Sequence, residues 1–178
     1  MAYNFYSGKM ASDQLDSQLT NAVLEKDVFD GSLVVLGDLA KDDTYAADGV
    51  EYDVYKADAP AAATDEVVIV DYAGISEGEI AGNNYKMGIK LFDLKVPAGT
   101  PTRVRRLALH DKFWLGEDNF ASTPTVGKYA VATAGDFKHT PAAEKPASGY
   151  AIRILASKDF NAGTTIYGKQ YLCEVVAL

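Results

Sequence analysis

The chain has 178 residues, of which 48 % are hydrophobic, and a formal net charge of −8 at pH 7. This length suits one good hydrophobic core and is short for two independent ones. A charged fraction of 24 % together with 11 Tyr and 7 Phe excludes a largely disordered chain. The overall acidity also disfavours nonspecific nucleic-acid binding, because an acidic protein repels DNA and RNA at long range.

The charge is divided by position along the chain. Residues 1–80 carry 17 Asp and Glu against 4 Lys, a net −13, whereas residues 81–178 carry 8 acids against 13 Lys and Arg, a net +5. Because complementary charge orients protein partners, this layout favours contact with neighbours over chemistry.

No apolar run approaches the roughly 18–20 residues of a membrane span, and Met1–Ala11 lacks the basic start and apolar stretch of a signal peptide. We therefore expect a protein made in the cytosol, with no membrane partner. The single cysteine, Cys173, lies in an apolar run and is expected to be a small buried hydrophobe.

Residues 1–30 are predicted to form an N-terminal arm followed by one helix. Tyr3, Phe5 and Tyr6 are too apolar for a solvated tail, so the arm is expected to pack on its own domain or on a neighbour. Ser12 or Asp13 can cap a helix that runs to about Lys26. The apolar residues of that segment fall on one helical face, and they are Leu15, Leu19, Ala22 and Val23.

Residues 31–178 are predicted to form a single β-rich domain. Short apolar or alternating runs separated by Gly, Pro, Asp and Asn are typical of strands and turns. The expected strands are Ser32–Leu36, Val50–Lys56, Glu66–Ala73, Tyr85–Val96, Thr102–Leu109, Val126–Thr133, Tyr150–Ala156 and Thr165–Ala177. The predicted fold class is therefore mainly β, an antiparallel β-sandwich or barrel with one N-terminal helix and an arm, with exposed loops at Ala57–Asp65 and His139–Gly149.

Few residues carry catalytic chemistry. His110 follows an apolar strand and His139 lies in a polar loop, and neither has a nucleophile motif nearby. The acidic cluster from Asp42 to Asp53 lacks the spacing of an EF-hand and is interpreted as a solvated turn. We expect no catalytic residue, no metal site and no cofactor; a hydrolase that uses Asp71 with Glu77 or Glu79 is a further hypothesis.

The sharpest polar feature is the cluster Arg103, Arg105 and Arg106. On a strand, the first two side chains share one face, and their guanidinium groups suit carboxylates either of the same domain or of an adjoining subunit. The single tryptophan, Trp114, suits core packing, an interface anchor or a platform for a sugar. The candidate interface residues are Tyr3, Phe5, Tyr6, Arg103, Arg105, Arg106 and Trp114.

Several turn-and-strand segments resemble auxiliary or decoration (cement) proteins of tailed-bacteriophage capsids. These segments cover roughly the C-terminal half, and they are Val96–Arg103, Asp118–Phe120, Val126–Val131 and Ala162–Gly168 with the ending Val175–Val176. The resemblance implies a small β-rich protein that binds the outside of an assembled head and bridges major capsid subunits, often as an oligomer.

We therefore expect a structural virion protein, not an enzyme, on the capsid surface. Its expected partners are the major capsid protein and further copies of the chain, with no nucleic acid and no membrane. The alternatives are a carbohydrate- or ligand-binding β-sandwich that uses Trp114, and a phage tail or baseplate component.

Overall fold

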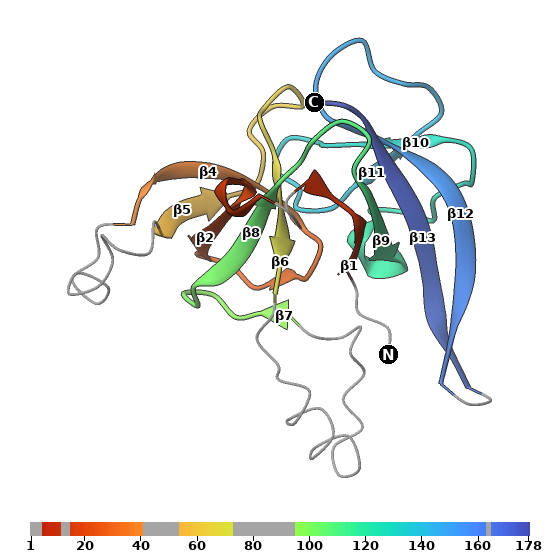
Figure 1. The fold of residues 1–178 in the computed structure, drawn as a ribbon, viewed down its shortest axis with the longest axis horizontal. Helices are drawn as coiled ribbons and strands as arrows, with labels where there is room; N and C mark the ends of the chain where they lie inside the picture. Colours follow the sequence, from red (N-terminus) through yellow and green to blue (C-terminus); the bar gives the residue numbers. More distant parts are fainter. Residues whose placement is uncertain (1–4, 12–14, 41–53, 73–94, 163–164) are drawn as a thin grey trace.

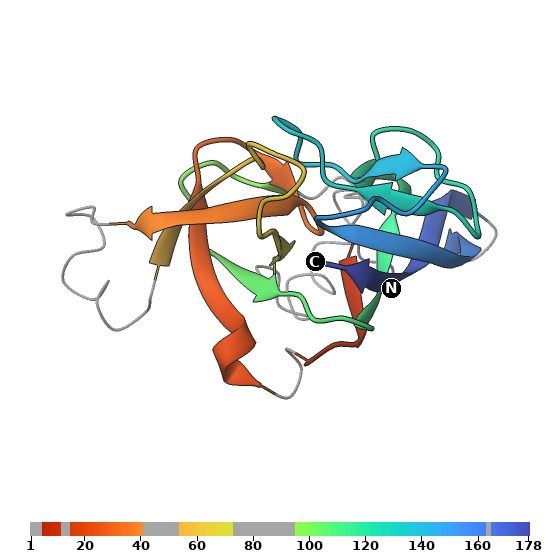
Figure 2. The ribbon, with the colours of Figure 1, turned by 90° about the horizontal axis from the view of Figure 1, so that it is seen from above.

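The computed structural model describes residues 5–11, 15–40, 54–72, 95–162 and 165–178. The structure is mainly β, with a closed barrel, a six-stranded sheet and a short two-stranded sheet. The barrel and the six-stranded sheet, called here the main sheet, lie side by side along the long axis of the molecule (Figures 1 and 2).

The barrel is built from the earlier part of the chain. In spatial order its strands are β2 (Leu19–Leu24), β5 (Val54–Asp58), β4 (Leu33–Leu39), β6 (Val68–Asp71) and β8 (Thr102–Arg106). Strands β2 and β5 run parallel, whereas the other neighbouring pairs run antiparallel. The barrel is therefore not the purely antiparallel structure that the strand pattern predicts.

The main sheet combines the first described strand with the last strands of the chain. Its order is β1 (Phe5–Lys9), β9 (Lys112–Gly116), β13 (Thr165–Ala177), β12 (Ala151–Ala162), β10 (Tyr129–Val131) and β11 (Thr140–Ala142). All its neighbouring strands are antiparallel. The two-stranded sheet pairs β3 (Val28–Phe29) with β7 (Lys95–Val96).

Alternating side chains of the barrel strands pack in two separate hydrophobic cores. Val34, Val68 and Val70 point into the barrel, whereas Leu33 and Ile69 pack with the buried face of the main sheet. Because successive side chains of a strand point to opposite faces, β6 is buried on both sides. This burial explains why it lies in an uninterrupted apolar run.

The predicted N-terminal helix is wrong. Residues Asp16–Gln18 form only a short 3-10 turn, η2, and Leu19–Leu24 form strand β2. Ala22 and Leu24 are both buried in the barrel, which is the two-residue period of a strand. Backbone pairing with β5 on one side and β8 on the other outweighs a helical spacing that rested on four apolar residues.

The later strands match the sequence pattern better. Strand β13 has the predicted bounds and is paired on both sides, by β9 and β12. The predicted loop His139–Gly149 is wrong in part, because Thr140–Ala142 form β11 and His139 is fully buried. Cys173 is buried as predicted, and burial raises the pKa of its thiol well above its ordinary value.

The turn Asp30-Gly31 joins the barrel to the main sheet. The Gly31 N–H donates to the Val70 carbonyl of β6 at 2.9 Å. From the main-sheet side, the Asn119 side-chain amide donates to the Asp30 carbonyl at 2.9 Å, and the His139 ring donates to the Gly31 carbonyl at 3.1 Å. The backbone of two residues thus binds three segments that are far apart in sequence.

Gly31 is required at this turn for two reasons. Its φ is +90°, and an added Cβ would lie 2.5 Å from the Asn119 amide nitrogen and 3.0 Å from a Leu115 methyl carbon. We expect Gly31→Ala to lower the free energy of unfolding by about 2–4 kcal/mol, from backbone strain and overpacking together. Denaturant unfolding followed by circular dichroism measures this loss.

Gly127→Ala is the matched control for Gly31→Ala. Gly127 has a similar φ of +85° but nothing within 4 Å of the added Cβ, so it reports the backbone strain alone. Equal losses in the two variants would show that the close approach of Asn119 and Leu115 does not constrain the turn.

Candidate functional site

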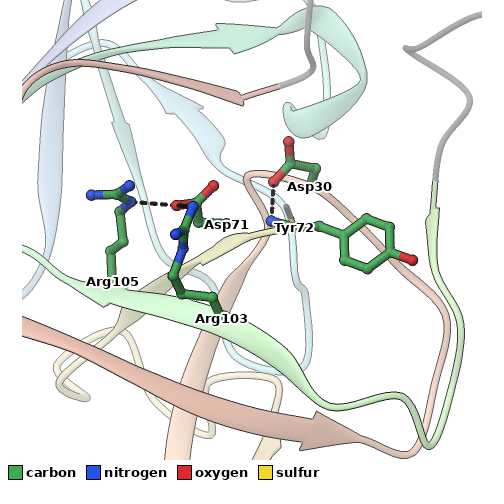
Figure 3. Close-up of polar contacts among 5 residues, drawn as sticks. All are labelled: Asp30, Asp71, Tyr72, Arg103 and Arg105. Carbon is green, nitrogen blue, oxygen red and sulfur yellow. Dashed lines mark hydrogen bonds and ion pairs between the residues drawn. The ribbon is translucent and has the colours of Figure 1, made fainter. Parts of the chain in front are cut away.

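The arginine cluster is paired with acids of the same chain. The Asp71 carboxylate oxygen Oδ2 lies 2.6 Å from both Arg103 Nη2 and Arg105 Nε, as Figure 3 shows for the latter pair. The register of β6 and β8 places Asp71 opposite Arg103. Arg106 Nη1 contacts Glu66 Oε1 at 2.9 Å.

These ion pairs join the acidic and basic parts of the sequence within one molecule. The Arg105 side chain is only 9 % exposed and the Asp71 side chain 13 %, so this pair is shielded from solvent. The Arg103 side chain is 38 % exposed, and Arg106 pairs with a Glu66 side chain that is 81 % exposed. The exposed Arg106–Glu66 pair contributes little to stability, because water screens it. Of the two pairings that the sequence left open, the one within the domain is observed.

Asp30 is a buried carboxyl group close to this cluster (Figure 3). Its Oδ1 accepts the Tyr72 N–H at 2.8 Å, and it also accepts a backbone hydrogen bond from Phe5. Burial raises the pKa of Asp30 to about 8, helped by the charge of Asp71 and opposed by these hydrogen bonds and Arg103. A single carboxyl group therefore holds the start of β1 and the end of β6.

We expect Asp30 to make stability fall as pH rises. Its pKa is about 8 in the folded protein against an ordinary 3.8, so between these values the folded state keeps a proton that the unfolded chain releases. The free energy of unfolding should decline from about pH 4 to about pH 8 and then level off. Asp30→Asn, which is neutral throughout, should lack this decline.

Urea unfolding of wild type and Asp30→Asn across this pH range measures the difference. His139 is present in both proteins, so its titration cancels. Asp38→Asn removes an exposed carboxyl group of β4 and is the matched control. A wild-type curve that runs parallel to Asp30→Asn would contradict the assignment.

His139 has a structural role in this fold. The ring is fully buried, its Nε2–H donates to Gly31, and its Nδ1 accepts the Tyr150 hydroxyl at 3.1 Å. Burial lowers the pKa of His139 to about 4, which keeps the imidazole neutral. The sequence placed this residue in a polar loop, whereas in the fold it pairs with Phe120 in a β-bridge and is buried.

His110 is in a different setting. It is an exposed residue with a φ of +72°, and its Nδ1 lies 3.4 Å from Glu174 Oε1. The next residue, Asp111, accepts the backbone N–H groups of Ala11 and Ala108. The structure therefore does not bring the two histidines together.

Trp114 lies on the face of the main sheet opposite the buried one. Its neighbours Phe113 and Leu115 are fully buried, whereas Trp114 is partly exposed, so it does not belong to the core. Lys158 Nζ lies 3.9 Å from the centroid of its ring. This cation–π contact covers one face of the indole and leaves less of it for a sugar.

We call this side of the main sheet the outer face. Strand register places three cations and one acid on it together with aromatic and aliphatic groups, and these residues are Lys112, Trp114, Tyr129, Arg153, Lys158, Leu172 and Glu174. Glu174 Oε1 lies 3.8 Å from Lys112 Nζ. The outer face therefore has an apolar centre and a net positive charge.

Strands β12 and β13 extend past the rest of the main sheet. Strand β10 pairs with Ala151–Arg153 and β9 pairs with Gln170–Glu174, so Asp159–Ala162 and Thr165–Lys169 lie beyond both. In the described residues no third strand joins this segment, called here the β12–β13 ribbon. Figure 1 shows it projecting from the molecule.

A groove beside the barrel strands β2, β4 and β5, called here the barrel groove, was not foreseen from the sequence. It has a volume of about 550 Å³ and is lined by apolar side chains of β2, β4 and β5 and by four charged residues, Glu25, Lys56, Asp58 and Asp65. Asp65 also accepts the backbone N–H groups of Ala61 and Ala62, which folds the loop after β5 over one side. No motif marks this groove, because its walls come from three separate segments.

The remaining candidates are placed as follows. Phe5 is 4 % exposed, and its ring centroid lies 5.7 Å from that of Phe113, so this arm residue packs on its own domain. Tyr6 pairs with Trp114 in the backbone register of β1 and β9. Tyr3, the Asp42–Asp53 cluster, and Glu77 with Glu79 lie outside the described residues.

The described residues contain no group of three or more His, Cys, Asp and Glu side chains that could hold a metal ion. A membrane-spanning helix is likewise not found among them. No protein-family model matches the sequence, and a search of curated proteins gives no match.

Proposed function

We propose that this protein is a structural virion component that binds the outer surface of an assembled bacteriophage capsid and stabilises it by bridging major capsid subunits. In this role it is made in the host cytoplasm, resides on the capsid surface and acts by binding, not by catalysis. The proposal combines the resemblance of the C-terminal half to decoration proteins with one structural observation, the β12–β13 ribbon.

The ribbon supports a binding role because of its exposed backbone. A two-stranded hairpin is marginally stable alone in water, and both of its outer edges carry backbone groups without a strand partner. Asp159 and Lys169 are exposed on it, and Ser157 and Lys158 are exposed at its base. Pairing with a neighbouring subunit would satisfy these edges and stabilise the hairpin.

Removal of the ribbon tests the proposal. Lys158 and Gln170 are register partners, so an Asn-Gly turn can replace residues 159–169 and close the hairpin directly. We expect the shortened protein to fold and to bind shells of the major capsid protein about tenfold more weakly or worse. Co-sedimentation with assembled shells measures the binding, and heating of the loaded shells measures their stabilisation.

Lys145→Glu, a charge reversal in an exposed loop away from the ribbon, is the control and should bind as wild type does. Equal binding by the shortened protein would remove the ribbon from the binding site. Purified particles that lack the chain at stoichiometric levels would overturn the capsid role itself, and recovery with tails alone would favour the tail or baseplate alternative.

A further inference from the structure

The barrel groove and the outer face have opposite charge. Glu25, Asp58 and Asp65 outnumber Lys56 around the groove, and its floor is apolar, formed in part by Val23, Leu24 and Leu36. A pocket of about 550 Å³ has room for a large side chain, since pockets of roughly 300–1,000 Å³ hold small ligands.

The outer face offers the complementary features. Lys112, Arg153 and Lys158 outnumber Glu174 on it, and Lys158 lies over the ring of the partly exposed Trp114. The Lys112 side chain is 42 % exposed. Trp is enriched among interface hot spots, in which the surrounding contacts exclude water from the centre.

We propose that the outer face of one copy of this protein binds the barrel groove of a second copy, in a head-to-tail contact. The occupant of the groove is the centre of the outer face, with the Lys158 ammonium group among the groove carboxylates. The inference does not rest on the proposed function, because it concerns the purified chain alone.

The two surfaces cannot meet within one molecule. The strands of the groove, β4 and β5, and the strands of the outer face, β12 and β13, lie toward opposite ends of the long axis (Figures 1 and 2). A contact between two different patches is heterologous, so it repeats from copy to copy and builds rings or open chains. Each copy then leaves one groove and one outer face for the next.

Two complementary variants test this contact. In the face variant, Arg153→Gln and Lys158→Gln remove the net positive charge of the outer face, so that the altered face does not attract the altered groove of the other variant. In the groove variant, Glu25→Lys and Ala61→Lys reverse the charge of the groove at two exposed positions and leave the Asp58 and Asp65 hydrogen bonds in place. Each variant keeps one intact surface.

Sedimentation velocity over a concentration series gives the outcome. Wild type should associate at low ionic strength and dissociate as the Debye length falls from about 30 Å at 0.01 M to about 3 Å at 1 M. Each variant alone should associate about tenfold more weakly or worse. An equimolar mixture of the two should form a one-to-one complex that grows no further, because one intact groove then meets one intact outer face.

Lys145→Glu, outside both surfaces, should associate as wild type does, and circular dichroism confirms that each variant is folded. A wild type that stays monomeric at low salt, variants that still associate, or a mixture without the one-to-one complex would each overturn the proposal. None of these results bears on binding to capsid shells, so failure here leaves the proposed function standing.

Discussion

The backbone of the Asp30-Gly31 turn is the constraint on which the arrangement of barrel and main sheet depends. Its two carbonyls accept hydrogen bonds from Asn119 and His139, and its amide donates to Val70. A buried carbonyl left without a donor costs roughly 1–3 kcal/mol, so displacement of any one partner is expensive. The turn therefore fixes the spacing at which Leu33 and Ile69 of the barrel strands pack against the buried face of the main sheet.

The same turn explains which parts of the fold the sequence could and could not predict. Strand β13 was predictable because its apolar run is paired by β12 along its length and by β9 from Gln170 to Glu174, and it needs no special partner. The helix over residues 12–26 was predicted wrongly because the pairing of β2 comes from β5 and β8, which are distant in sequence. Likewise, nothing local to His139 shows that a glycine carbonyl more than a hundred residues away satisfies its ring.

Charge along the sequence and charge on the molecule are related but not identical. Some acids of residues 1–80 do not contribute to the surface charge, since Asp71 pairs with two arginines and Asp30 is buried. What remains exposed is distributed over particular surfaces, with acids at the barrel groove and cations on the outer face. The positions of Arg103, Arg105 and Arg106 in the sequence were enough to predict the arginine cluster. The groove could not be predicted in this way, because its walls come from segments that meet only in the folded barrel.

The strand order has a consequence for synthesis on the ribosome. All barrel strands lie between Leu19 and Arg106, so the barrel has every strand it needs before β9 emerges. Strand β1 cannot pair until β9 has been made. The delay is long, since Ala11 and Asp111, which are hydrogen-bonded beside this pair of strands, are 100 residues apart in sequence. Because β13 lies between β9 and β12, the main sheet stays divided until this last strand has been made. Until then the edges of β9 and β12 are exposed, and a nascent chain can mispair there.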